Sequence, residues 1–180
     1  MERLHQPRTL EKVRRNNVTK TKNSFVYKII DSPVGQITLV ATDKALISLM
    51  WGKNKNDLKG FVRAEKNHVI LTIVEAQLKD YFKGKRKTFD IPLAPEGTEF
   101  QKLVWLQLLK IPFGETISYG EQAKRLGKPN AARAVGAANG KNPIGIIIPC
   151  HRVIGASGSL TGFAGGLDAK KFLLALEGRL

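Results

Sequence analysis

The sequence is poor in cysteine, in acidic residues and in long apolar runs, and each shortage excludes a class of protein. Cys150 is the only cysteine among 180 residues, so the chain can form neither an internal disulfide nor a zinc site made of several cysteines. No apolar run approaches the roughly 20 residues that span a membrane. The first 22 residues lack the apolar segment of a secretory signal. We therefore expect a soluble intracellular protein without a membrane partner.

Acidic residues are scarce relative to basic ones, with 15 Asp and Glu against 30 Lys and Arg, for a formal net charge of +15. Such a charge favours a polyanionic partner, most economically nucleic acid, although a basic surface that serves only solubility is an alternative. Hydrophobic residues make up 42% of the chain, which is enough to bury a core and excludes disorder throughout.

The N-terminal half changes character after a basic beginning. Residues 1–23 hold seven basic and two acidic residues, and we expect them to form a flexible tail. Apolar and polar residues then alternate in three segments separated by turn signals, at 25–30, 36–40 and 45–51. This alternation predicts a three-stranded antiparallel meander. The polar stretch 52–70 that follows has room for a short helix.

A helix is predicted next, followed by a change in composition. Thr72 and Glu75 form a capping box, which predicts a helix from there to residues 82–84. The basic segment 83–87 is more simply a solvated helix end than a DNA contact. Residues 92–97, with two prolines and a glycine, predict a linker to a different kind of structure.

The second half is predicted to be mainly helical. A capping box at Thr98 and Gln101 precedes an apolar helical stripe. A further capping box at residues 118–121 opens a short helix, and a second helix over 131–140 follows a tight turn that contains glycine. These two short helices predict a helix-turn-helix.

The last third contains one predicted strand and one predicted helix. Residues 146–148 are three isoleucines before a proline, which predicts a buried strand. Asp168 is predicted to cap a final helix that runs to Glu177. The fold class is therefore α+β, with a small antiparallel sheet and helix first and a mainly helical domain second. We predict a tail at 1–23, an α+β domain at 24–91, a linker at 92–97 and a C-terminal domain at 98–180.

The second helix of the helix-turn-helix is unusual for a sequence reader. Such helices carry side chains that reach base edges, but here Arg133 stands among Ala132, Ala134, Gly136 and other small or apolar residues. Small residues allow close, sequence-independent contact with DNA around one intruding cation. They serve equally well for packing one helix against another inside the protein, and the pattern alone does not decide between the two.

The lone cysteine has a histidine beside it. A single cysteine is most often an inert core residue, and reactivity requires a base or positive surroundings that favour the thiolate. Cys150 and His151 are neighbours, which in an extended chain point to opposite faces, so a turn after Pro149 or a bridging water is needed. Glu177, in the last helical turn, is either simply exposed or buried beside His151, where it would orient the imidazole.

Five short motifs give the chain a family resemblance. They occur in this order: residues 133–136 (Arg-Ala-Val-Gly), 142–143 (Asn-Pro), 149–153 (Pro-Cys-His-Arg-Val), 162–166 (Gly-Phe-Ala-Gly-Gly) and 173–178 (Leu-Leu-Ala-Leu-Glu-Gly). In order and spacing they resemble the O6-alkylguanine-DNA alkyltransferases, the methylated-DNA–protein-cysteine methyltransferases. The resemblance is strongest over residues 98–178, while the first half is similar only in its α+β order and length.

The resemblance implies a DNA-binding and alkyl-transfer domain at 98–180 that repairs DNA by direct reversal. Cys150 would accept an alkyl group irreversibly from O6-alkylguanine, and possible substrates include O4-alkylthymine. By resemblance, Glu177 holds His151, which deprotonates Cys150 through a water, while Asn142 bridges the two segments. The further roles implied by resemblance are these: Tyr119 helps to flip the nucleotide and protonates the guanine, Arg133 fills the gap in the base stack from the minor groove with Ala132, Ala134 and Gly136 close to the DNA, and Phe163, Ala164, Gly165 and Val153 line the pocket.

The resemblance also implies what accompanies the reaction. No cofactor and no metal is expected, because the cysteine itself is the acceptor. The expected partner is double-stranded DNA, bound by a monomer, in the cytoplasm of a prokaryote or the nucleus of a eukaryote. Phe163 stands where many relatives have tyrosine, Ala164 replaces a polar residue of some members, and Gly145 replaces a proline of vertebrate members. A non-catalytic, alkyltransferase-like DNA-binding protein is the alternative, as is a cysteine hydrolase.

Overall fold

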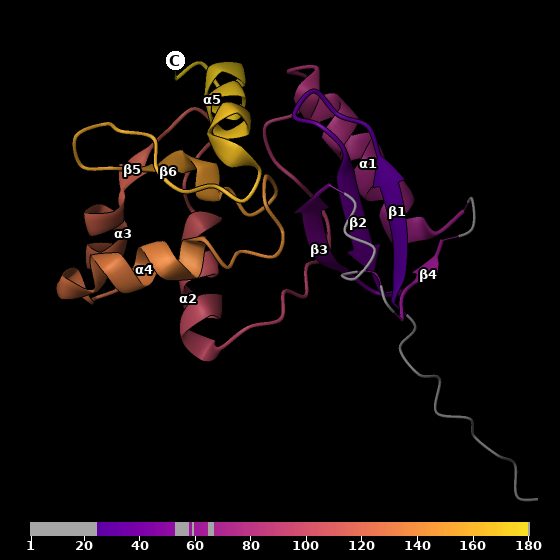
Figure 1. Cartoon of the computed structure of the whole chain (residues 1–180), viewed down its shortest axis with the longest axis horizontal. Helices are drawn as coiled ribbons and strands as arrows, with labels where there is room; N and C mark the ends of the chain where they lie inside the picture. The colour runs from indigo at the N-terminus through magenta and orange to yellow at the C-terminus, as the bar shows by residue number, and fades with distance from the viewer. Residues whose placement is uncertain (1–24, 53–57, 59, 65–66, 180) are drawn as a thin grey trace, which may run out of the picture.

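The structure, a computed structural model, describes residues 25–52, 58, 60–64 and 67–179. A sheet with one helix and a larger, mainly helical part lie side by side (Figure 1). The α+β fold class predicted from the sequence is therefore confirmed, whereas the predicted tail at 1–23 lies outside the described residues. No helix in the described ranges is long and apolar enough to cross a membrane.

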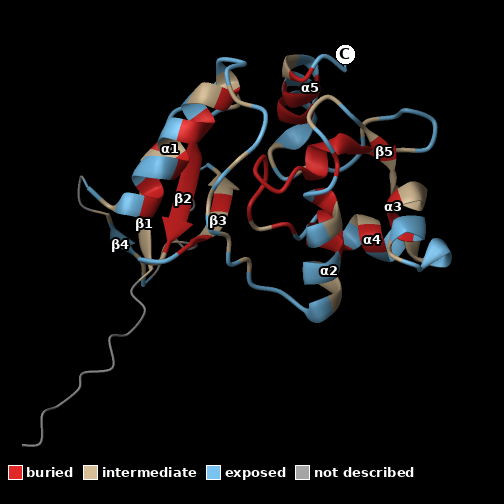
Figure 2. Ribbon diagram, turned by 180° about the vertical axis from the view of Figure 1, so that it is seen from behind, coloured by how far each residue is buried: buried red, intermediate tan, exposed pale blue. Residues whose placement is uncertain are grey.

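The N-terminal sheet contains the predicted meander. Strands β1 (Val26–Ile30), β2 (Ile37–Ala41) and β3 (Leu46–Trp51) pair antiparallel in sequence order. A short strand β4 (Val62–Arg63), which the sequence did not suggest, joins the free edge of β1 in parallel, so the sheet order is β3-β2-β1-β4. Every residue of β2 is buried (Figure 2), which makes it the centre of this core. Between residues 52 and 68 the described positions contain β4 and no helix.

Helix α1 (Val69–Phe82) packs on the sheet, and its start differs from the prediction. The cap is His68, whose Nδ1 accepts a hydrogen bond from the Leu71 amide, so the helix begins before the Thr72 capping box. An imidazole nitrogen here accepts the hydrogen bond that a Ser or Thr hydroxyl usually accepts at a helix start. A search for the usual capping residues therefore did not identify His68. The predicted end is correct, since the helix stops just before Gly84, which adopts φ +70°.

The predicted helix-turn-helix is confirmed. Helix α2 (Glu99–Leu108) begins with the complete capping box of Thr98 and Gln101. Helix α3 (Tyr119–Arg125) begins at the Ser118 cap, and a 3-10 turn (Pro129–Ala131) leads into α4 (Ala132–Asn139). Hydrogen bonds fix the relative positions of these helices, from Trp105 Nε1 to the Ala138 carbonyl (2.9 Å), from Gln122 Nε2 to the Val104 carbonyl (3.2 Å), and from Asn139 Nδ2 to Gln122 Oε1 (2.8 Å).

Two predictions for the last third are wrong. Residues 146–148 form a buried turn rather than a strand, and Ile146 has φ +70°. Three isoleucines imitate a buried strand, but the glycine and prolines around them favour a tight turn. Helix α5 (Gly166–Leu176) begins before Asp168, so this aspartate lies in the first turn and does not cap the helix. The remaining elements are a 3-10 helix (Cys150–Arg152) and a parallel pair of short strands, β5 (Ile117–Ser118) and β6 (Val153–Ile154).

The outer edge of β3 is covered by chain from the second half of the molecule. Leu46 forms a parallel bridge to Leu93, in the segment predicted as a linker, and Leu49 forms one to Ile144. Ser48 Oγ and the Leu49 amide both donate to the Pro143 carbonyl, at 2.9 and 2.8 Å. The edge of the sheet is therefore protected, and the segment that precedes Cys150 is anchored to the N-terminal sheet.

Candidate active site

Cys150 is the first residue of a single 3-10 turn. Pro149 places it there, with its backbone at φ −83° and ψ 66°, and the turn continues through His151 and Arg152. The cysteine is only 8% exposed and is a free thiol. The turn that adjacent Cys and His side chains need in order to share one site is thus present immediately after the proline.

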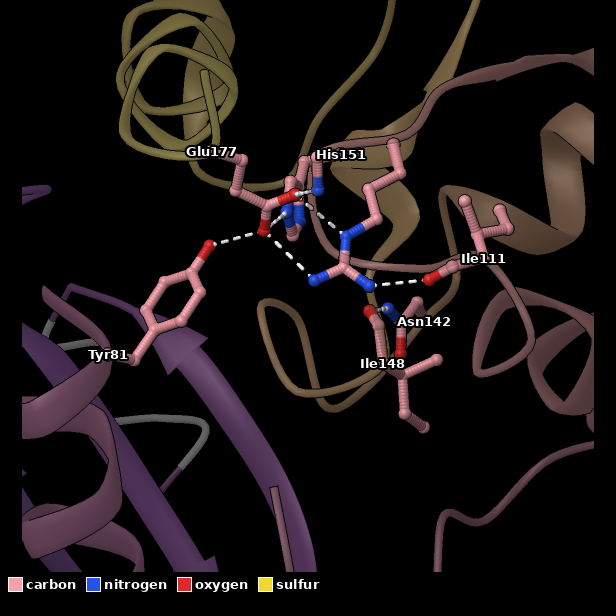
Figure 3. Close-up of polar contacts among 8 residues, drawn as sticks. Tyr81, Ile111, Asn142, Ile148, His151 and Glu177 are labelled. Atoms are coloured by element: carbon pink, nitrogen blue, oxygen red, sulfur yellow. Dashed lines mark hydrogen bonds and ion pairs between the residues drawn. The ribbon is translucent and has the colours of Figure 1, made fainter. Parts of the chain in front are cut away.

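Asn142 braces the chain that leads to the cysteine. Its Nδ2 donates to the Ile148 carbonyl at 2.7 Å (Figure 3). Its Oδ1 accepts from the Ile144 amide at 3.0 Å. One side chain therefore holds both ends of the buried turn at 144–148. The Asn142 side chain also acts to lower the pKa of the Cys150 thiol, against the larger effect of burial.

His151 and Glu177 form a pair with no exposed side-chain surface. The His151 Nε2 atom lies 3.0 Å from Glu177 Oε1, although the two residues are 26 positions apart (Figure 3). Glu177 is the C-terminal cap of α5 and is 5% exposed. Of the two interpretations of this glutamate, simple exposure is therefore wrong and burial beside the histidine is correct.

Glu177 has three further partners that the sequence did not indicate. Arg152 binds both carboxylate oxygens, through Nε to Oε2 and through Nη2 to Oε1, each at 2.9 Å. Tyr81 Oη donates to Oε1 at 2.7 Å, and the Gly114 amide donates to Oε2 at 3.2 Å. The carboxylate is thus held by four groups on the 3-10 turn, on α1 and on the loop after α2.

Burial and these contacts shift the titration of the site. Burial raises the pKa of the Cys150 thiol, and it lowers the pKa of His151 against the opposing effect of Glu177. Burial alone would raise the pKa of Glu177, but the hydrogen bonds from His151 and Arg152 outweigh it and lower this pKa to about 2. The resting site therefore contains a thiol, a neutral imidazole and an ionised carboxylate.

This protonation state defines which nitrogen of His151 is free. An ionised carboxylate can only accept hydrogen bonds, so Nε2 carries the proton that is donated to Glu177. The other nitrogen, Nδ1, is then a bare acceptor, and it is buried without a hydrogen-bond partner in the described part of the chain. Nδ1 is therefore the His151 nitrogen that is available to accept a proton, on the residue that follows Cys150 in the chain.

Lys170 is a second buried cation near the cysteine. It lies on α5 with 0% exposure, and its Nζ donates to the carbonyls of Val153 (2.6 Å) and Thr161 (2.8 Å). Burial lowers the pKa of Lys170, and the Cys150 thiolate opposes this effect. The charge of Lys170 in turn counteracts the rise in the pKa of Cys150.

An aromatic group closes one side of the site. The ring of Phe163 packs edge-on against Trp51, with centroids 5.1 Å apart, and lies 6.3 Å from the ring of His151. A Cβ atom at Gly145 would lie 2.6 Å from the Trp51 indole, and one at Gly165 would lie 2.5 Å from it. The absence of side chains at both glycines is therefore what admits Trp51, a β3 residue, between the two loops.

The predicted pocket and DNA residues have different exposures. Val153 is fully buried, Phe163 and Gly165 are partly exposed and Ala164 is exposed. On the helix-turn-helix, Arg133 and Ala134 are exposed, whereas Ala132, Gly136 and Tyr119 are partly exposed. Helix α4 thus packs through one face, which includes Val135 and Ala138, and presents the other to solvent (Figure 2). The buried face thus serves packing inside the protein, whereas contact of the exposed face with DNA stays a prediction.

Tyr119, the first residue of α3, connects the helix-turn-helix to the loop that ends at Gly166. Its hydroxyl accepts a hydrogen bond from Thr161 Oγ1 at 3.2 Å. A Cβ atom at Gly136 would lie 3.5 Å from its ring, which is ordinary contact distance, so the ring rests against α4. The side chain of Tyr119 therefore contacts both α4 and the residue that precedes the loop at 162–166.

Sequence reasoning missed Tyr81, Trp51, Arg152 and Lys170. Lys170 carried a usable signal, because a lysine on the buried face of α5, beside Ala169 and Leu173, requires buried partners. Arg152 had a weaker one as the immediate neighbour of His151 in the most specific motif. Tyr81 and Trp51 follow ordinary apolar patterns, and nothing local distinguishes them from other core residues.

Two family models match this chain. The 6-O-methylguanine DNA methyltransferase DNA binding domain matches residues 99–179, and the 6-O-methylguanine DNA methyltransferase ribonuclease-like domain matches residues 25–95. Methylated-DNA--protein-cysteine methyltransferases from Methanosarcina acetivorans (53% identity over 84% of this chain and 97% of the relative) and Mycolicibacterium paratuberculosis (51% over 85% and 92%) are similar to it.

Solved structures show the same likeness. A crystal structure of Mycobacterium tuberculosis OGT in complex with DNA is similar with a TM-score of 0.79 and 47% identity, over 84% of this chain and 92% of that one. Sequence and structure therefore agree along most of the length of each protein. From the two matching models and from relatives at about half identity, we conclude that this chain belongs to the 6-O-methylguanine DNA methyltransferase family.

Proposed function

We propose that this protein repairs DNA by direct reversal, as a methylated-DNA–protein-cysteine methyltransferase. It transfers the alkyl group of an O6-alkylguanine in DNA to Cys150, irreversibly and once per molecule. The observation that carries the proposal is the buried Nδ1 of His151, on the residue after the only cysteine, which has no hydrogen-bond partner among the described residues while Nε2 is bound to Glu177. The relatives named for this activity and the likeness to a DNA complex support it.

The proton path follows from the resting state of the site. The proton of the Cys150 thiol passes to Nδ1 of His151 through a bridging water, and the ionised Glu177 stabilises the imidazolium that forms. Asn142 and Lys170 act on the thiolate, because both oppose the effect of burial on the pKa of Cys150. The site thus produces its nucleophile only when a proton acceptor is in place.

The chemical step is a single displacement. The thiolate attacks the alkyl carbon in line, a C–S bond forms, and the C–O bond breaks with its electron pair moving to the guanine. Tyr119 donates a proton to the leaving guanine. The proton that His151 took from the thiol then returns through water to the Tyr119 oxygen, so the protons balance. The resulting thioether is stable to water, so the cysteine is not regenerated and no cofactor takes part.

DNA binding is assigned to the exposed face of the helix-turn-helix. The protein binds double-stranded DNA as a monomer and inserts α4 into the minor groove. Arg133, exposed on α4, replaces the extruded base in the stack, while Ala132, Ala134 and Gly136 permit close approach. The flipped base lies against Phe163 and beneath Ala164 and Gly165, with Val153 behind it. The DNA-binding and alkyl-transfer domain is the segment 98–180, joined through 92–97 to the α+β domain at 24–91.

The direct test is a mass measurement. The protein is incubated with duplex DNA that contains O6-methylguanine, and intact mass followed by peptide mapping locates the product. We expect one methyl group per molecule, on Cys150, and none in Cys150→Ala, which is the matched control because the chain has no other cysteine. An unmodified wild-type protein, or the same adduct in Cys150→Ala, would contradict the proposal. Tight binding to the lesion without any adduct would instead favour a non-catalytic, alkyltransferase-like protein.

A further inference from the structure

Tyr81 connects the N-terminal sheet and helix to the candidate active site. It lies in the last turn of α1, is fully buried, and reaches Glu177 across a sequence separation of 96 residues. Its ring packs against Phe82, Phe89 and Phe113, with centroids 5.6, 5.4 and 6.2 Å away. This aromatic packing fixes the ring, so the hydroxyl is directed at the carboxylate by a rigid support.

The hydroxyl of Tyr81 binds the same oxygen as the histidine. Oε1 of Glu177 accepts from Tyr81 Oη at 2.7 Å, from His151 Nε2 at 3.0 Å and from Arg152 Nη2 at 2.9 Å (Figure 3). Burial and the charge of Glu177 raise the pKa of Tyr81, so the hydroxyl keeps its proton and can only donate it to the carboxylate. Three donors therefore share the electron density of one oxygen.

We propose that Tyr81 is a positioning residue that limits how strongly Glu177 draws on the imidazole N–H of His151, and so sets the fraction of Cys150 that reacts as thiolate. A carboxylate oxygen that already accepts a short hydrogen bond is a weaker acceptor for a second donor. The proposal rests on the proposed function, because it assigns His151 as the base for Cys150.

Charged and titratable groups on three elements surround the pair formed by His151 and Glu177. Tyr81 on α1, Arg152 on the 3-10 turn and Lys170 on α5 face the pair formed by His151 and Glu177, and Cys150 is its neighbour in the chain. Arg152 and Lys170 are cations whose charges do not depend on the tyrosine hydroxyl. Removing that hydroxyl therefore changes one hydrogen bond to Oε1 and leaves the charges of the site as they were.

The consequence is a specific change in the pH dependence of alkyl transfer. The reactive form arises when a neutral thiol passes its proton to a neutral imidazole, so its population rises with the basicity of His151. The alkyl-transfer rate should therefore rise with pH along an acid limb, where His151 loses its proton, and then reach a plateau. At pH values well below this limb His151 is already protonated, and the rate depends only on the acidity of the Cys150 thiol beside a charged ring. A change in the hydrogen bond between Glu177 and His151 thus alters the height of the plateau and the pH of the limb together. It leaves the rates at low pH unchanged.

The test uses Tyr81→Phe, which keeps the ring, in single-turnover assays on O6-methylguanine duplex DNA from pH 5 to 9. We expect the plateau rate to rise about threefold and the acid limb to move about half a pH unit upward, with the low-pH rates coinciding. Tyr27→Phe is the matched control, since it removes the hydroxyl of a β1 tyrosine outside the site and should reproduce the wild-type profile. Thermal unfolding of both variants reports on folding.

A fluorinated tyrosine at position 81 gives the opposite test with the hydroxyl retained. Its more acidic hydroxyl donates more strongly, so the plateau should fall and the limb should move downward. An unchanged profile in both proteins, or a lower plateau with an unmoved limb in Tyr81→Phe, would overturn the role of Tyr81. If Cys150 of the wild-type protein accepted no methyl group from the DNA, the proposed function itself would be overturned, so the two failures are distinguishable.

Discussion

The two halves of the molecule divide charge and chemistry unequally. Residues 1–91 contain 19 basic and 9 acidic residues, whereas 92–180 contain 11 and 6, so the net charges are +10 and +5. The half with the smaller charge nevertheless carries Cys150 and the helix-turn-helix. The more basic half contributes two uncharged side chains to the site, Tyr81 and Trp51. Bulk charge and chemical function are thus separate properties here, and the N-terminal half acts on the site by packing and hydrogen bonding.

The largest expected effect on stability comes from replacing Glu177, whose carboxylate binds residues of both halves. Glu177→Gln leaves the buried guanidinium of Arg152 without its counter-charge, and loss of one partner of a buried ion pair costs about 3–5 kcal/mol. We expect the free energy of unfolding at pH 7 to fall by that amount, measured by denaturant titration. An equal stability of variant and wild type would show that Glu177 does not hold the halves together.

The same variant has a characteristic pH dependence. The pKa of Glu177 is about 2 in the folded protein and 4.5 for an ordinary glutamate, as in the unfolded chain, so the stability it adds is present above pH 4.5 and disappears as the pH falls toward 2. The difference in stability between wild type and Glu177→Gln should therefore shrink across this window. A difference that stays constant from pH 7 to pH 3 would contradict the lowered pKa.

A smaller effect is expected where Trp51 of β3 enters between two loops. In Gly165→Ala the new Cβ would lie 2.5 Å from the indole, and overpacking of this kind costs about 1–3 kcal/mol. When Trp51→Ala is combined with Gly165→Ala, the clash is removed and the alanine at 165 should destabilise the protein much less. Thermal unfolding of the single and double variants gives this difference as a coupling energy. Gly120→Ala is the control, because its nearest neighbour would be 3.8 Å away. Additive effects of Gly165→Ala and Trp51→Ala would show that the two sites are independent.

Replacing Arg133 tests whether the recognition of damaged DNA depends on the less basic C-terminal half. We expect Arg133→Ala to slow the repair of O6-methylguanine in duplex DNA by about tenfold, because one base-stack contact of about 1.4 kcal/mol is lost. Attack on the free base O6-methylguanine should be unchanged, since no base has to be extruded. Both rates are measured by methyl transfer under single-turnover conditions. Equal losses on the two substrates would exclude the proposed role in base displacement.

The smallest effect is expected from the charge of the N-terminal half. Replacing the exposed Lys83, Lys85 and Lys87 by glutamine should change DNA affinity less than about twofold and leave its salt dependence intact. The matched set on the helix-turn-helix, Lys124, Arg125 and Lys128, should lower the slope of log affinity against log salt by about 2 to 3. Similar slopes for the two sets, measured by titration from low to high salt, would place DNA on both halves.

Local patterns predicted those elements whose causes are local. Alternation identified β1 to β3, and the capping boxes at Thr98 and Ser118 located α2 and α3. The three isoleucines at 146–148 misled, because burial of a turn and burial of a strand leave the same apolar signature. The Cys150, His151 and Glu177 cluster was accessible through its motifs. Contacts across the halves, such as Tyr81 with Glu177, depend on tertiary packing and have no signature within either segment.

The position of Trp51 gives the protein an optical property. The chain has two tryptophans, and Trp105 is buried in α2 with its Nε1 bound to the Ala138 carbonyl. Trp51 instead lies between Gly145 and Gly165, in contact with Phe163, and its buried Nε1 has no hydrogen-bond partner in the described residues. In a Trp105→Phe background its fluorescence would come from the seam between the loops alone. Trp51 is thus an intrinsic fluorophore that contacts Phe163 and Gly165, two residues of the proposed pocket.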